Sequence, residues 1–269
     1  MTSTANFSAN PTTFCGNYSV LVAEPPGLLG ALAINANHVI APMRMHATFA
    51  PFATLPSVSV CTIGAAATAS SVGCYFLPYL PDGATTMTIG GADDYFFTSM
   101  MTGCSLQVFG PAAAPTITHS NAGGTFNGTA GTLAAATAAA QIQINNMFPA
   151  VPLGEVGHTA TRLDLNGAYT PGSQLYARNN YPALPGYRVK DFNFDMVNTK
   201  GTNRPELGMF SFGVRNPGTG DWTFYWSASA SVHGRQKSGH THLGFIKVGV
   251  QNNNIVDEVS LGGAVQFWP

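Results

Sequence analysis

The stretch MFSFGVRNPGTGDWTFYWSASA, residues 209–230, is a clear signal for β-structure in this chain. Its second part, residues 222–230, is rich in aromatic residues, which favour β-strands. The preceding segment NPGTG, residues 216–220, has the composition of a tight turn. We therefore predict a β-hairpin in which residues 209–214 pair with residues 222–230.

The rest of the chain shows the same spacing of turn signals. Short apolar or alternating runs are bounded by Gly, Pro, Asn or Asp, as expected for strands. These runs cover residues 18–23, 58–63, 73–77, 106–109, 116–119, 210–214, 222–228 and 244–250. We predict an α+β fold that is mainly β, with a mixed β-sheet sandwich core flanked by a few helices. No repeat or linker divides the chain, so we expect residues 1–269 to form a single domain.

Two segments favour helices. Residues 93–101 (DDYFFTSMM) begin with two acids suited to an N-cap and carry apolar side chains at helical spacing. Residues 132–148 are alanine-rich with an apolar face, although they also have the composition of a low-complexity insertion. Residues 149–204 show no periodicity, and we interpret them as irregular connections over the core.

Charge is scarce and unevenly distributed. Only 9% of residues are charged and the net charge is −1, against about 25% charged residues in an average globular protein. Residues 95–154 contain no Asp, Glu, Lys or Arg. Without a basic patch we expect no nucleic-acid partner and no membrane partner. A polar, uncharged surface is compatible with contacts to another protein.

The N-terminus and the cysteines bear on the cellular location. Residues 1–19 contain no Lys or Arg and no apolar core of a signal peptide, and residues 27–36 are too short to span a bilayer. We expect a protein that is soluble where it is made, and we expect any export to follow a route that does not use this kind of signal. The cysteines are too few for a disulfide scaffold and form no Cys-x-x-Cys pair, so we expect four thiols: Cys15, Cys61, Cys74 and Cys104.

One thiol and one imidazole lie on neighbouring elements of the chain. Cys104 follows a Thr-Gly turn between two apolar runs, and His119 lies near the end of the next predicted strand. A thiol and an imidazole are the minimum parts of a cysteine nucleophile with its base. The spacing alone is weak evidence, because most such residues are buried core or edge residues.

The surrounding residues resemble the glutamine deamidase toxins, namely the Burkholderia lethal factor type and the cytotoxic necrotizing factors. The resemblance covers residues 77–122 and is faint at residues 234–236. It is carried by Leu77-Pro78-Tyr79, Phe96-Phe97-Thr98, Thr102-Gly103-Cys104, Val108-Phe109-Gly110, Pro115 and His119-Ser120-Asn121-Ala122. Two features depart from the family: Thr102 replaces the usual serine, and the loop at residues 110–115 is longer than in the lethal factor.

The resemblance implies a protein-glutamine deamidase that uses Cys104 as the nucleophile and His119 as the base. Thr98 matches a threonine of the lethal factor active site. Gly103 lets the substrate approach the backbone closely, and Thr102 keeps a hydroxyl before it. Backbone N–H groups at residues 103–104 and the Thr98 hydroxyl are the expected oxyanion donors. A backbone carbonyl or Asn121 is a candidate for orienting the histidine.

No cofactor is implied. The resemblance also implies a bacterial origin, with synthesis in the bacterial cytoplasm and delivery to a host cytosol. The implied partner is a host protein, such as a Rho-type GTPase or a translation-initiation helicase.

Other interpretations stay open. A transglutaminase would use the same pair with an amine in place of water, and a cysteine protease is a more distant alternative. A β-rich assembly protein without catalysis is the non-enzymatic alternative, favoured by the charge-poor first half. His240 and His242 have a spacing able to bind zinc, but without an obvious third ligand we expect no metal site. We interpret His38 and His46 as structural.

Overall fold

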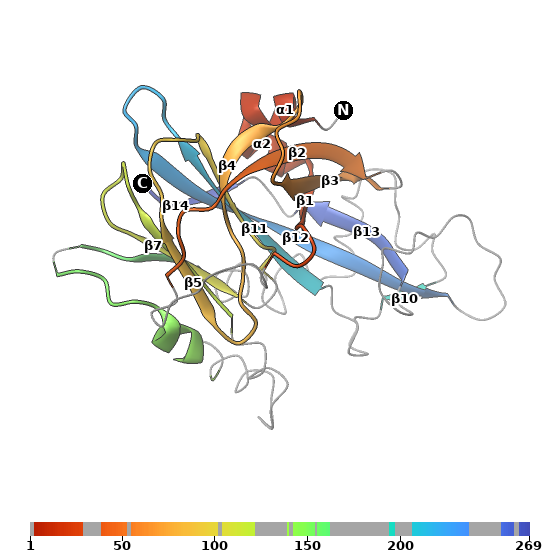
Figure 1. Ribbon diagram of the computed structural model, residues 1–269. Helices are drawn as coiled ribbons and strands as arrows, with labels where there is room; N and C mark the ends of the chain where they lie inside the picture. The colour runs from red at the N-terminus through yellow and green to blue at the C-terminus, as the bar shows by residue number, and fades with distance from the viewer. Residues whose placement is uncertain are drawn as a thin grey trace.

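The structure is a computed structural model of the chain. Its described residues include two β-sheets and two short N-terminal helices (Figure 1). The larger sheet has ten strands and the smaller has four. The described residues are 3–28, 39–52, 55–101, 104–121, 139, 142–153, 155–161, 194–196, 206–236, 254–260 and 264–269.

The large sheet is mixed. Its main path is β1-β3-β2-β4-β6-β11-β12-β10, with β13 and β14 also paired to β12. The β1–β3 and β4–β6 pairs are parallel, and the other pairs are antiparallel. The bounds of its strands are β1 Ser19–Ala23, β2 Arg44–Phe52, β3 Leu55–Gly64, β4 Val72–Leu77, β6 Tyr95–Thr98, β10 Phe194–Met196, β11 Glu206–Arg215, β12 Trp222–Gln236, β13 Asn254–Ser260 and β14 Val265–Trp268.

The small sheet is entirely antiparallel, in the order β5-β8-β7-β9. Its strands are β5 Ala84–Thr88, β7 Ser105–Phe109, β8 Thr116–Ser120 and β9 His158–Thr161. Strands β7 and β8 form a hairpin whose turn contains Gly110 in the left-handed region, at φ 96°. Glycine suits that position because it has no Cβ to clash with the backbone.

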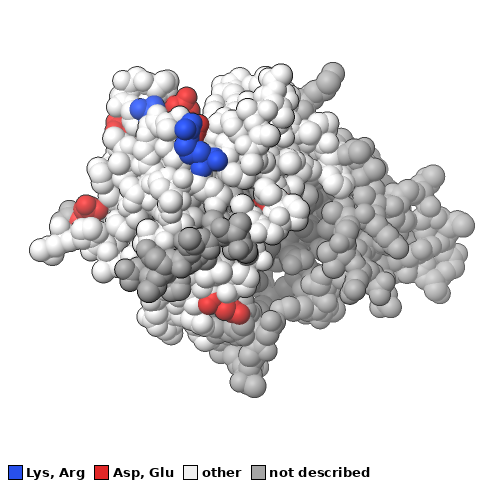
Figure 2. Space-filling view, in the orientation of Figure 1, with Lys and Arg blue, Asp and Glu red and all other residues white. Residues whose placement is uncertain are grey.

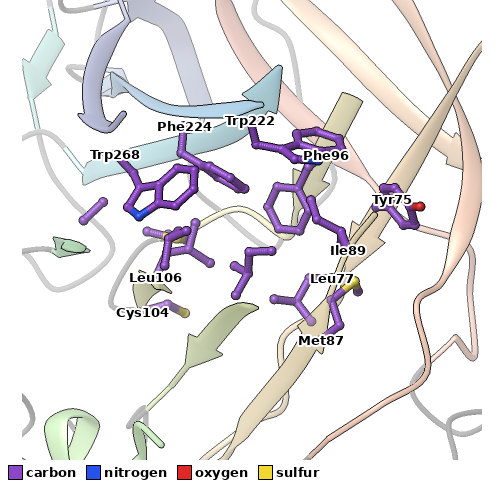
Figure 3. Packing of buried hydrophobic residues seen from close by; sticks show 14 of the residues in the cluster. Tyr75, Leu77, Met87, Ile89, Phe96, Cys104, Leu106, Trp222, Phe224 and Trp268 are labelled. Carbon is purple, nitrogen blue, oxygen red and sulfur yellow. The ribbon is translucent and has the colours of Figure 1, made fainter. Parts of the chain in front are cut away.

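An apolar core lies between the two sheets (Figure 3). The large sheet contributes Leu77, Phe96 and Phe224, and the small sheet contributes Met87, Leu106 and Ile117, all of them buried. Figure 3 shows Cys104 beside Leu106 in the same cluster. The first residue of the predicted pair is therefore part of the packing between the sheets.

The opposite face of the large sheet carries a second, aromatic core. Helices α1 (Thr4–Ala9) and α2 (Pro11–Asn17) cover this face and contribute Phe7 and Phe14. Each helix begins at a polar cap, because the Ser3 and Asn10 side chains accept hydrogen bonds from backbone N–H groups of the first turn. The helices, the large sheet and the small sheet therefore form three layers.

The structure confirms the predicted fold class and most of the predicted strands. The hairpin predicted within residues 209–230 is present as β11 and β12. The two strands pair from Glu206↔Ser231 to Arg215↔Trp222. Its turn is closed by a hydrogen bond from Gly220 N–H to Asn216 O at 2.8 Å. The predicted strand at residues 244–250 lies outside the described residues.

The helix predicted at residues 93–101 is wrong, because this segment forms β6. Strand β6 lies between β4 and β11, with Phe96 in the core between the sheets and Phe97 in the aromatic core. A strand that is buried on both faces loses the alternation that would identify it in a sequence.

The two acids before β6 form ion pairs and do not cap a helix. Asp93 pairs with Arg44 at 2.7 Å, and Asp94 pairs with Arg215 at 3.4 Å. On the molecular face in Figure 2, charged side chains form a few separate patches among the described residues, and most of the described surface is uncharged, as the composition predicts. The two ion pairs therefore connect the residues before β6 to β2 and to β11 of the same sheet.

The predictions for residues 132–148 and 149–204 can be compared with the structure only in part, because many of these residues lie outside the described ranges. Residues 142–147 are helical, within the predicted helix at residues 132–148, whose remainder lies largely outside the described residues. The interpretation of residues 149–204 as wholly irregular is wrong, because β9 and β10 lie within them. Strand β9 has only four residues, too few for a periodic pattern to be recognised.

Candidate active site

Strand pairing places Cys104 and His119 on one face of the small sheet. His119 in β8 lies directly opposite Leu106 in β7, and the next pair is Ser105 and Ser120. Cys104, one residue before β7, therefore lies opposite Asn121. Because side chains alternate between the faces of a strand, Cys104, Leu106, His119 and Asn121 share the face that packs against the large sheet. The Cys104 and His119 side chains are diagonal neighbours, a relation within reach of long side chains.

A threonine from the other sheet holds the imidazole. His119 Nδ1 is 2.6 Å from the Thr98 hydroxyl oxygen, and Thr98 is the last residue of β6. The Thr98 hydroxyl also donates its single hydrogen to the carbonyl oxygen of Leu77 at 2.6 Å, because a carbonyl can only accept. The Thr98 oxygen must therefore accept from His119, so Nδ1 carries the hydrogen.

This assignment leaves His119 Nε2 as the basic nitrogen. Nε2 is buried and makes no hydrogen bond in the part of the chain that the structure describes. The imidazole is thus fixed in one orientation and one tautomer, as a general base requires.

An amide contacts the thiol from the end of the hairpin. Asn121 Nδ2 donates to Cys104 Sγ at 3.0 Å. Asn121 Oδ1 accepts from the backbone N–H of Asp82 at 3.2 Å, and the Asn121 backbone N–H donates to Gly83 O at 2.8 Å. The turn before β5 therefore fixes Asn121 through both its backbone and its side chain.

The site is buried, and its imidazole is uncharged at neutral pH. Cys104 is 4% exposed, while Thr98 and His119 are both 0% exposed. Burial lowers the pKa of the His119 imidazole to about 3, because desolvation disfavours its charged form. The ring centroid of Tyr79 lies 6.3 Å from that of the imidazole. The His119 imidazole is therefore neutral in the resting protein at neutral pH.

The burial of His119 predicts a specific acid sensitivity. The unfolded chain takes up this proton near pH 6.5, but the folded chain only near pH 3. Within that window the unfolded state binds more protons, so the free energy of unfolding falls as the pH falls, by up to about 1.4 kcal/mol per pH unit. Urea unfolding of the wild type and of His119→Gln across the window measures this term.

The two unfolding curves should converge as the pH is lowered, because the glutamine cannot titrate. Other groups contribute equally to both proteins. One is Glu24, whose pKa is raised by burial and lowered less by a hydrogen bond from Ser99. Parallel curves for the wild type and His119→Gln would show that His119 is not buried as a neutral group.

The structure brings three of the five expected site residues together: Thr98, Cys104 and His119. Thr102 and Gly103 lie outside the described residues. The expected role of Thr98 as an oxyanion donor does not fit the geometry, because its hydroxyl hydrogen is donated to Leu77 O. Thr98 instead orients His119, the role for which the sequence had suggested a carbonyl or Asn121.

The remaining cysteines and histidines do not join this site. Cys15, Cys61 and Cys74 are buried, reduced thiols in the aromatic core on the other side of the large sheet. Burial raises the pKa of all three, and that of Cys74 reaches about 12. Among the described residues no group of three metal-binding side chains occurs, and His38, His240 and His242 lie outside them.

Comparison with known proteins gave no match, either to a protein-family model or to a curated protein. Within the described part of the chain, no helix is both long and apolar enough to cross a lipid bilayer.

Proposed function

We propose that this protein is a cysteine-dependent protein-glutamine deamidase. The observation that carries the proposal is the Thr98–His119 hydrogen bond, which fixes a neutral imidazole with its basic Nε2 on the same face as the Cys104 thiol. A nucleophile, a base and a third group that orients the base are the parts of a nucleophilic catalyst. The resemblance of residues 77–122 to the glutamine deamidase toxins supports glutamine as the substrate.

The proposed reaction proceeds through a thioester. His119 Nε2 takes the Cys104 proton, and the sulfur attacks the glutamine carboxamide carbon while the carbonyl electrons move to oxygen. When the oxyanion collapses, the C–N bond breaks and the imidazolium gives its proton to the departing ammonia. A water molecule, deprotonated by Nε2, then attacks the thioester. Glutamate leaves, and the proton returns from the imidazolium to the Cys104 sulfur.

The burial of the thiol defines what a substrate must do. Because Cys104 is 4% exposed, a glutamine side chain can reach it only if binding separates groups that now cover it. Cys104 and Asn121 lie just beyond the ends of β7 and β8, so the site is at the end of the hairpin opposite its turn. We place substrate entry there. We propose a host protein as substrate, with a Rho-type GTPase and a translation-initiation helicase as the two classes implied by the resemblance.

Mass spectrometry tests the proposal directly. The protein is added to a eukaryotic cell lysate, and peptides are searched for glutamine residues that have become glutamate. New sites that appear with the wild type and not with His119→Gln would support the proposal and identify the substrate. Covalent attachment of an added amine at glutamine would indicate a transglutaminase, and new chain ends would indicate a protease.

Removing the Thr98 hydroxyl should slow catalysis without removing a reacting atom. In Thr98→Val the His119 Nδ1–H loses its acceptor, so the imidazole loses its fixed tautomer and orientation. We expect kcat to fall on the order of 10²-fold, the lower range of the contribution of a general base. The rate of glutamate formation on the identified substrate measures this.

Thr98→Ser is the matched control, because it keeps the hydroxyl and should recover most of the rate. A purely structural role of Thr98 predicts the reverse, because valine preserves the buried volume and the β-branched shape while serine does not. Equal rates for Thr98→Val and the wild type would contradict the assignment of Thr98 as a positioning residue.

The burial of the site also favours a second candidate function, that of a non-catalytic assembly protein. In that case Cys104 is a packing residue of the core between the sheets, and the charge-poor surface mediates protein contacts. Iodoacetamide separates the two functions. Labelling of Cys104 that becomes slower in His119→Ala supports the enzyme, because the base then promotes the thiolate. Labelling at the same rate in both proteins supports the assembly protein.

A further inference from the structure

The hydrogen bond from Asn121 to Cys104 has no part in the reaction as described above. Its donor, Asn121 Nδ2, lies 3.0 Å from Cys104 Sγ. A thiol sulfur is a weak acceptor, but an ionised acceptor makes shorter and stronger hydrogen bonds. An N–H group held this close to sulfur is therefore suited to the thiolate, the form that attacks the substrate.

The direction of this amide is fixed by the turn before β5. A backbone N–H can only donate, so the bond from Asp82 N–H identifies the nearby atom of Asn121 as the oxygen and orients the amide nitrogen towards the sulfur. Asp82 itself adopts a left-handed conformation, at φ 51°, which is uncommon for a residue other than glycine. Asn121 N–H also donates to Gly83 O, so the residue is held at two points.

The electrostatics of the site call for such a donor. Proton transfer from Cys104 to His119 Nε2 creates a thiolate and an imidazolium in a region where burial disfavours both charges. Among the described residues, the titratable groups of this region include His119 and, beside the imidazole, Tyr79. Asp82 contributes its backbone N–H, while the residue itself is exposed. Asn121 Nδ2, at 3.0 Å from Cys104 Sγ, is a donor in direct contact with the sulfur when the negative charge forms.

We propose that Asn121 is a catalytic residue of the deamidase, with its amide N–H stabilising the Cys104 thiolate. This inference rests on the proposed function, because it gives Asn121 a part in the same reaction. In the step concerned the S–H bond breaks, the electron pair stays on sulfur, and the proton passes to His119 Nε2. The Asn121 N–H bond is not broken, and it strengthens as the charge forms.

The test is the pH dependence of the Cys104 thiolate in three proteins: wild type, Asn121→Ala and Asn121→Asp. Thiolate ultraviolet absorbance is followed against pH, with Cys104→Ser as the blank for the other thiols, and Cys104 alkylation by iodoacetamide is followed in parallel. In Asn121→Ala the apparent pKa of Cys104 should rise by about one unit, giving about tenfold less thiolate below that pKa.

Asn121→Asp distinguishes an electrostatic role from a structural one. The aspartate is nearly isosteric and keeps the acceptor for Asp82 N–H and the backbone bond to Gly83, but it places an oxygen at the sulfur. A structural role predicts wild-type titration of Cys104 in this variant. The proposal predicts a rise in pKa at least as large as in Asn121→Ala. Unchanged titration of Cys104 in both folded variants would overturn the proposal.

The test separates the inference from the proposed function, because it needs no substrate. If the Cys104 thiolate depends on Asn121 but the protein converts no glutamine, only the proposed deamidase function is overturned. Full glutamate formation by Asn121→Ala would overturn the role of Asn121 alone.

Discussion

The Cys104→Ser variant should form no detectable glutamate on a substrate that the wild type converts. A serine hydroxyl is far less acidic than a thiol, and the neutral His119 imidazole cannot generate its anion in a buried site. By comparison with other enzymes that lose their nucleophile, we expect the rate to fall by on the order of 10⁴-fold or more. Quantitative mass spectrometry of the target peptide measures the loss.

The fold should survive this change, because serine is nearly isosteric and its oxygen can still accept from Asn121 Nδ2. Cys74→Ala is the matched control. Cys74 is also buried, but it lies in the aromatic core on the far side of the large sheet. Its variant should keep its activity per folded molecule. Glutamate formation by folded Cys104→Ser at the wild-type rate would exclude Cys104 as the nucleophile.

The Phe7→Ala variant should lose about 3–5 kcal/mol of unfolding free energy, the range observed when a buried phenylalanine is truncated. Phe7 is 0% exposed and stacks on Phe49 with 4.1 Å between the ring centroids. It also contacts Phe97 of β6 and Phe212 of β11, at 5.6 and 5.7 Å between centroids. Phe7 therefore attaches helix α1 to the centre of the large sheet. Urea unfolding monitored by circular dichroism measures the change.

Phe7→Leu is the control for this effect, since it keeps most of the apolar volume and should cost clearly less than Phe7→Ala. The ring packs on the side of the large sheet opposite the small sheet, so the folded fraction of Phe7→Ala should still be active under stabilising conditions. A loss below about 1 kcal/mol, typical of an average substitution, would mean that α1 does not close the aromatic core in solution.

The sequence predicted the β11–β12 hairpin but not the neighbouring strand β6. The turn residues between β11 and β12 made the pairing of these strands predictable, because Asn216 and Gly220 close a local turn. Strand β6 was mistaken for a helix because its apolar run is buried on both faces. The two acids before it have the composition of a helix cap. In the structure they pair with Arg44 and Arg215, which belong to strands far away in the sequence. Such long-range pairs cannot be inferred from local composition.

The site was predicted in its parts but not in its geometry. The sequence indicated Cys104 and His119, and the motif resemblance indicated Thr98. The role of Thr98 depends on Leu77, whose carbonyl takes the hydroxyl hydrogen. This partner is contributed by the backbone of β4, so no sequence pattern reveals it. Asn121 was a candidate for orienting His119, but the strand register places it on Cys104.

The β7–β8 hairpin has a consequence for how related sites can be recognised in other genomes. Cys104 and His119 are aligned by the pairing of Ser105 with Ser120 and of Leu106 with His119, whereas the residues between the strands only close the far end. An insertion after Gly110 would lengthen that turn and disturb the bond from Trp222 N–H to Ala112 O, yet leave the thiol and the imidazole in place. A search pattern should therefore fix both residues relative to the strand ends and leave the number of residues between them free.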